Sequence, residues 1–186
     1  MSAGQLAVAA WAAAVLVACR TAPPEPAGYW SGPTDAPVPA TLHGGRVLHG
    51  RALHRLLGTH PVLVDVSNAP RRPPTLAPGS AWLPPAHTDI PGSVWIPGAG
   101  LADIPPAVDV LYRSTLQGAT GGDLRRPVIV YCHAHCWLSW NAARRAVSYG
   151  YLNVCWYPDG VEGWRSSGGP LAPVEATQPQ ATAPPG

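Results

Sequence analysis

Apolar positions along this chain follow two different periods that alternate from one segment to the next. Short apolar and β-branched runs, typical of buried strands, occupy residues 46–48, 62–66, 128–131 and 154–157. Apolar side chains at helical spacing mark residues 51–58, 102–116 and 138–149. Strands that alternate with helices predict an α/β fold of three layers, in which a small, mainly parallel sheet carries helices on both faces.

The N-terminal residues have the pattern of an export signal. Residues 6–17 form an apolar stretch that is too short to cross a bilayer comfortably, as in the central region of a signal peptide. The stretch ends in Leu16-Val17-Ala18-Cys19, which resembles a bacterial lipobox. We therefore expect a signal peptide over 1–19 and a periplasmic protein, anchored to the outer membrane if Cys19 is lipidated. The alternative is an ordinary cleaved signal, in which Cys19 has no special role.

Proline-rich and polar segments set the limits of the folded domain, which we place at 43–172. Residues 20–42 are rich in Pro and Ala and predict a tether with a few anchored residues, such as Tyr29 and Trp30. Residues 173–186 predict a disordered tail. The stretch 67–89 is long for a connection inside a small domain, so we expect it to be functional or disordered.

Composition excludes one class of partner. The chain has 12 basic and 10 acidic residues, a net charge of +2, and no basic run or aromatic platform. Such a weak charge does not favour nucleic acid. Contact with a membrane is expected only through a lipid anchor.

Candidate chemistry lies in the segment Cys132-His133-Ala134-His135-Cys136-Trp137, between a predicted strand and a predicted helix. Free N–H groups and the positive end of a helix dipole favour a thiolate there, which makes Cys132 a candidate nucleophile. Cys136 is then the resolving thiol, His133 or His135 favours the Cys132 thiolate, and Trp137 forms a wall of the site.

Two other interpretations of the same segment remain open. Cys132 and Cys136 would form a structural disulfide in an oxidising compartment. Together with His133 and His135 they are also weak candidates for binding zinc or copper(I), although five consecutive residues rarely wrap one ion. We expect no tightly bound cofactor. Cys155 lies in a predicted buried strand and is expected to be a small hydrophobic residue.

Motifs spread along the chain resemble the rhodanese-like domain over about residues 43–172. The resembling features are a strand ending in Asp65, an Ile90-Pro91-Gly92 turn, a strand ending in Cys132, an Ala142-Ala143 helix, and a closing Gly150-Tyr151-x-Asn153-Val154 with Gly160-x-x-Gly163-Trp164. The string Cys-x-x-x-Cys-Trp-x-Ser-Trp-Asn-Ala-Ala also resembles a narrower group, the pyrroloquinoline-quinone-dependent catabolism-associated proteins named for a "CXXCW" motif. Three residues, not two, separate the cysteines here.

The resemblance implies a sulfurtransferase-like enzyme with a persulfide on Cys132 as covalent intermediate. Its partners would be small sulfur species or a thiol or quinoprotein-system partner in the periplasm. Thiosulfate enzymes of this kind carry a cation or hydroxyl at the far end of the loop, where Trp137 or Leu138 stands here. Thiosulfate turnover would therefore need Arg71, Arg72 or Arg144 to bind the substrate, and phosphatase activity is not expected. The alternative is a non-catalytic accessory module that holds a partner or a copper or zinc ion.

Overall fold

The computed structural model describes residues 22–177, which build a five-stranded parallel sheet in the order β1-β6-β5-β2-β4. Its strands are β1 (Arg46–Val47), β2 (Val62–Asp65), β4 (Ser93–Trp95), β5 (Val128–Tyr131) and β6 (Val154–Tyr157). A separate antiparallel pair joins β3 (Thr88–Asp89) to β7 (Ala172–Pro173). The predicted mainly parallel sheet is confirmed.

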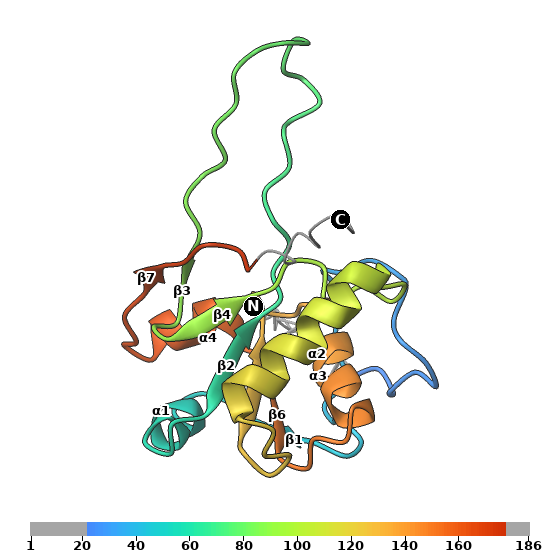
Figure 1. Ribbon diagram of the computed structural model, residues 1–186, viewed down its shortest axis with the longest axis vertical. Coiled ribbons are helices and arrows are strands. Elements are labelled where there is room, and N and C mark those ends of the chain that lie inside the picture. The colour runs from blue at the N-terminus through green and yellow to red at the C-terminus, as the bar shows by residue number, and fades with distance from the viewer. Residues whose placement is uncertain (1–21, 178–186) are drawn as a thin grey trace, which may run out of the picture.

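Helices cover both faces of this sheet (Figure 1). The helices are α1 (Ala52–Leu57), α2 (Pro106–Thr120), α3 (Trp137–Ser148) and α4 (Gly160–Ser166). Buried side chains of α2 and α3 share one apolar cluster with one face of the sheet, whereas Leu53 of α1 and Trp164 of α4 share a second cluster with the other face. The three-layer α/β fold is therefore as predicted.

Strand β5 is apolar at every position because side chains on both of its faces are buried. Val128 and Val130 lie in the cluster below α2 and α3, while Ile129 and Tyr131 lie in the cluster below α1 and α4. All four are fully buried. A central strand of a parallel sheet is covered on both sides, so it loses the alternation of polar and apolar residues.

Several boundaries differ from the sequence-based predictions. Helix α2 extends past the helical pattern at 102–116: it continues through Thr120, and Gly121 ends it in the left-handed conformation. Helix α4, which contains Gly160 and Gly163 of the closing motif, was not among the predicted helices. The expected tail is ordered at its start, because Ala172–Pro173 pairs with β3 and Thr177 donates its N–H to the Trp95 carbonyl. Close tertiary contacts override weak local signals at these places.

The predicted signal peptide and Cys19 lie outside the described residues, as does the chain beyond residue 177. Within the described residues, no helix combines the length and apolar character needed to cross a membrane. The long connection predicted at 67–89 projects from the body of the molecule between β2 and β3 (Figure 1).

Candidate functional site

Cys132 and Cys136 form a disulfide across the loop that joins β5 to α3. Their Cα atoms are 6.1 Å apart, and both residues are fully buried. Cys132 directly follows the last residue of β5, as predicted, and its carbonyl oxygen accepts the Val161 N–H of α4. The loop is thus fixed against the start of α4 while its two sulfurs are held together.

The helix N-terminus lies at Cys136 and not at Cys132, which corrects the expected electrostatics. Helix α3 begins at Trp137, and Cys136 is its N-cap residue with extended backbone angles. The field of a helix dipole falls off within the first turn, so Cys132 lies too far upstream to benefit from it. In the reduced protein the helix dipole therefore favours the Cys136 thiolate, and the assignment of Cys132 as the attacking thiol rests on its position directly after β5.

The backbone N–H groups expected to cradle an anion already have protein partners. Ala134 donates to Glu162 Oε2 at 2.8 Å, and His135 donates to the Pro158 carbonyl at 3.2 Å. Trp137 donates to the Thr34 carbonyl at 2.9 Å. A carboxylate therefore occupies part of the loop surface where free N–H groups were expected.

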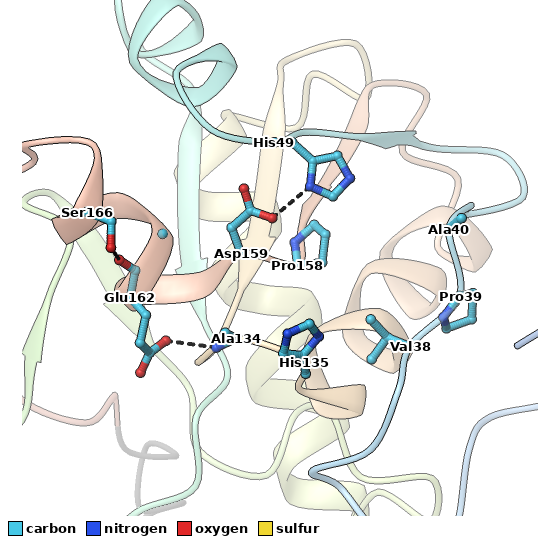
Figure 2. Close-up of a pocket in the computed structure, with 11 residues that line it drawn as sticks. Val38, Pro39, Ala40, His49, Ala134, His135, Pro158, Asp159, Glu162 and Ser166 are labelled. Atoms are coloured by element: carbon cyan, nitrogen blue, oxygen red, sulfur yellow. Dashed lines mark hydrogen bonds and ion pairs between the residues drawn. The ribbon is translucent and has the colours of Figure 1, made fainter. Parts of the chain in front are cut away.

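A pocket of about 460 Å³ opens on the outer side of this loop (Figure 2). His135, on the loop, points toward it in Figure 2, and the Glu162 carboxylate reaches the Ala134 N–H. Across the pocket, His49 Nδ1 lies 2.7 Å from Asp159 Oδ1. None of the described residues that line it is Arg or Lys. Its two carboxylates disfavour a dianion such as thiosulfate.

The three arginines proposed to bind substrate do not line this pocket. Arg72 donates to the carbonyls of Leu76, Ala77 and Ser80 in its own loop. Arg144 donates to the carbonyls of Pro26 and Ala27. Arg71 is exposed on the projecting connection. Arg72 and Arg144 thus hold chain segments in place, and the role of the three arginines in binding a substrate stays a prediction.

A covering segment, residues 29–41, lies over the disulfide loop and the first turns of α3. Trp30 stacks on Trp137 with ring centroids 4.4 Å apart, and Asp35 lies 3.1 Å from His133 Nε2. The Trp137 indole N–H also donates to the Pro37 carbonyl. This segment has almost no regular structure, as a tether would, but it is anchored along its length. Trp137 is accordingly a buried packing residue and not a pocket wall.

Trp30→Ala should make the disulfide easier to reduce. Aromatic pairs contribute about 0.5–1.5 kcal/mol beyond their buried area, so reduction of Cys132–Cys136 by a small dithiol should be up to about tenfold faster. Tyr29→Ala is the matched control, since Tyr29 packs on Arg145 at the other end of α3. Equal reduction rates in wild type and Trp30→Ala would mean that the covering segment does not restrict access.

A buried polar cluster adjoins Cys132 and was missed from sequence. It comprises Asp65, Ser67, His87, Asp89 and Tyr131, contributed by the ends of β2, β3 and β5 and by the residues beside them. The Ser67 hydroxyl donates to Asp65 Oδ1 at 2.6 Å and lies 3.4 Å from Cys132 Sγ. His87 Nε2 donates to Asp65 Oδ2 at 2.5 Å, and the His87 ring stacks on Trp95.

Two signals for this cluster were present in the sequence. Asp65 closes a buried strand, and His87 and Asp89 precede the Ile90-Pro91-Gly92 turn. Neither signal shows that the three side chains meet, because 22 residues separate Asp65 from His87.

Burial and charge shift the titration of this cluster. Desolvation, followed by the nearby charge of Asp65, raises the pKa of Asp89 to about 7. The hydrogen bond to Asp65 raises the pKa of His87 above its ordinary value. Asp89 is therefore a carboxyl group that is costly to ionise in the folded protein.

Asp89→Asn should remove a pH-dependent loss of stability. A carboxyl group with a raised folded-state pKa stabilises the fold below its ordinary pKa, and this contribution is lost as pH rises through the raised value. The free energy of unfolding of wild type, relative to Asp89→Asn, should therefore fall between about pH 4 and pH 7. Urea denaturation across this range measures it, and parallel curves for the two proteins would contradict it.

Comparison with known proteins identifies the class. A model of the rhodanese-like domain matches residues 51–167, and the chain belongs to this family. No curated protein matches the chain. At family level, sulfur-transfer chemistry is supported, since rhodaneses form a persulfide on cysteine.

Three solved structures are similar to this chain. An uncharacterized protein from Saccharomyces cerevisiae is 25% identical, over 66% of this chain and 92% of that one, with a TM-score of 0.40. Thiosulfate sulfurtransferase from Pseudomonas aeruginosa is 21% identical, with a TM-score of 0.47. The alignment covers 76% of this chain but only 22% of that protein. The polysulfide-sulfur transferase homodimer from Wolinella succinogenes is 19% identical, with a TM-score of 0.42. The alignment covers 70% of this chain and 80% of that one.

Proposed function

We propose that this protein handles sulfane sulfur and thiol–disulfide exchange through Cys132 and Cys136. The observation that carries the proposal is the bond between the two sulfurs in the loop after β5, where the resemblance to rhodanese-like domains implies a reactive cysteine. Cys132 accepts the sulfur and Cys136, at the N-cap of α3, resolves the product.

Each step balances without an external oxidant. The Cys132 thiolate attacks the outer sulfur of a persulfide RS–SH, which leaves Cys132–S–SH and releases RS⁻. The Cys136 thiolate then attacks Cys132 Sγ, forms the Cys132–Cys136 bond and releases HS⁻. A dithiol partner must reduce the disulfide before another turnover.

The pocket beside the loop favours a thiol-borne persulfide over thiosulfate as donor. Glu162 and Asp159 place negative charge on this surface, and no described Arg or Lys lines the pocket. Thiosulfate, a dianion, meets repulsion there. His133 and His135 flank Ala134 and are available to hold or move a proton at the loop, although His133 pairs with Asp35 in the oxidised protein.

An exported location and a role beside quinoprotein alcohol oxidation are part of the proposal. They rest on the apolar segment 6–17, on the Leu16-Val17-Ala18-Cys19 string and on the resemblance to the "CXXCW" group. A reporter fused to residues 1–25 should reach the cell envelope, and Cys19→Ala should release it from membranes if Cys19 is lipidated. Retention of the fusion in the cytoplasm would contradict export.

A structural role for the disulfide is the second candidate function. Complete burial of both sulfurs and the covering segment above them favour it, because a partner thiol cannot reach the bond without movement of residues 29–41. The protein would then be an accessory module that binds a partner without chemistry.

Sulfide release separates the two candidates. Reduced, dithiol-free protein mixed with glutathione persulfide should release about one sulfide per chain and regain its disulfide, as measured by sulfide assay and thiol titration. Thiosulfate should react far more slowly. Glu162→Gln, which keeps an acceptor for the Ala134 N–H, should bring the rate with thiosulfate closer to the rate with glutathione persulfide. A reduced protein that consumes no persulfide would support the structural role, and equal rates with thiosulfate would contradict the donor preference.

A further inference from the structure

A cluster of three potential ligands lies where β2 ends and β3 begins, on the two sides of the projecting connection. Asp65, His87 and Asp89 each offer one ligand atom, and these atoms lie within 4.8 Å of one another. Asp65 and Asp89 are no more than 1% exposed, whereas the His87 side chain is 19% exposed. The partly open imidazole gives a small ion a route to two buried carboxylates.

One buried oxygen in this cluster has no hydrogen-bond partner. Asp89 Oδ1 accepts the Ile90 N–H and the Tyr131 hydroxyl, but Asp89 Oδ2 is buried and unpaired. Buried polar atoms are normally satisfied, and an unsatisfied one points to a missing ion or water. Asp65 Oδ2 faces His87 Nε2 at 2.5 Å, so Asp89 Oδ2 is the open ligand position of the cluster.

Each of the two carboxylates, Asp65 and Asp89, accepts two hydrogen bonds on its Oδ1 atom. Asp65 Oδ1 accepts the Ser67 N–H at 2.8 Å and the Ser67 hydroxyl at 2.6 Å. Asp89 Oδ1 is likewise held by two donors. Asp65 Oδ2 then faces His87, and Asp89 Oδ2 has no partner. Outer hydrogen bonds that fix the direction of ligands in this way are typical of metal sites.

We propose that Asp65, His87 and Asp89 bind a divalent first-row transition metal, with Zn²⁺ as the representative ion. An imidazole among the ligands favours zinc over magnesium or calcium, which prefer sites made of oxygen alone. Three protein ligands leave one position of a tetrahedral ion for water or a small molecule. The site does not depend on the sulfur chemistry, although Ser67 joins its ligand Asp65 to Cys132.

The other group of potential ligands in the described part of the chain is Cys132, His133 and Cys136. Its sulfurs are bonded to each other, and a disulfide supplies no thiolate to bind zinc. Oxidised protein therefore isolates the proposed site from this competitor.

Zinc binding to oxidised, chelator-treated protein tests the proposal by calorimetry and by metal analysis after dialysis. We expect one Zn²⁺ per chain, and at least about tenfold weaker binding in Asp89→Asn and in His87→Gln. His133→Gln is the matched control and should bind as wild type does. Co²⁺ should give visible ligand-field bands without thiolate-to-metal charge transfer.

Circular dichroism separates loss of ligands from loss of fold, and the near-isosteric Asp89→Asn is expected to stay folded. The proposal is overturned if wild type binds no Zn²⁺, if both ligand variants bind it normally, or if His133→Gln removes binding. A thiolate charge-transfer band with Co²⁺ would assign the ion to the cysteines instead. None of these outcomes alters the persulfide experiment above, so the two proposals fail separately.

Discussion

Gly160→Ala should destabilise the fold by about 2–5 kcal/mol, one of the largest effects expected for a single added methyl group. Gly160 begins α4 with φ at +61°, where an L side chain is strained by about 1–2 kcal/mol. A Cβ atom there would also lie 2.3 Å from the His133 carbonyl carbon, which belongs to the backbone of the disulfide loop. The loop or the helix must move, and overpacking of this kind costs about 1–3 kcal/mol more.

Gly92→Ala is the matched control for this prediction. Gly92 has φ at +85°, but a Cβ atom there would meet nothing within 4 Å. It should therefore lose only the backbone strain, about 1–2 kcal/mol. Urea denaturation of both variants measures the difference. Equal losses would show that the loop does not depend on its close contact with Gly160.

Cys136→Ser should trap a persulfide on Cys132. Without the thiol at the N-cap of α3, the second step cannot form a disulfide, so the transferred sulfur stays on Cys132 and sulfide release falls by at least about a hundredfold. Mass spectrometry after glutathione persulfide treatment should find the added sulfur on the peptide that contains Cys132. Cys132→Ser should carry no persulfide and release no sulfide.

Cys155→Ser is the control for non-specific reaction of a thiol. Cys155 is free and buried in β6, where burial raises its pKa, and it takes no part in the proposed transfer. This variant should release sulfide as wild type does. A persulfide that accumulates on Cys136 in Cys132→Ser would reverse the assignment of the two thiols, and unfolding of both single variants would favour the structural disulfide.

The local pattern of apolar residues was sufficient to predict β5 and α3, the two elements on either side of the cysteine loop. The apolar run at β5 needs a sheet covered on both faces, and Leu138, Ala142 and Ala146 at helical spacing place α3 directly after the loop. Cys132 and Cys136 were close in sequence, so their pairing could be anticipated. The choice between catalytic and structural chemistry could not, because both need the same two sulfurs.

The sequence by itself determined the α/β class, the order of β1, β2, β5 and β6 and of α1, α2 and α3, and the position of the cysteine loop, because these depend on periodicity within short windows. Only the tertiary structure decided that Cys136 and not Cys132 caps α3, and that residues 29–41 cover the loop. It also brought His87 to Asp65 across 22 residues and Tyr131 to Asp89 across 42. Such contacts between distant residues depend on sheet order and loop packing, which no local pattern of residues encodes.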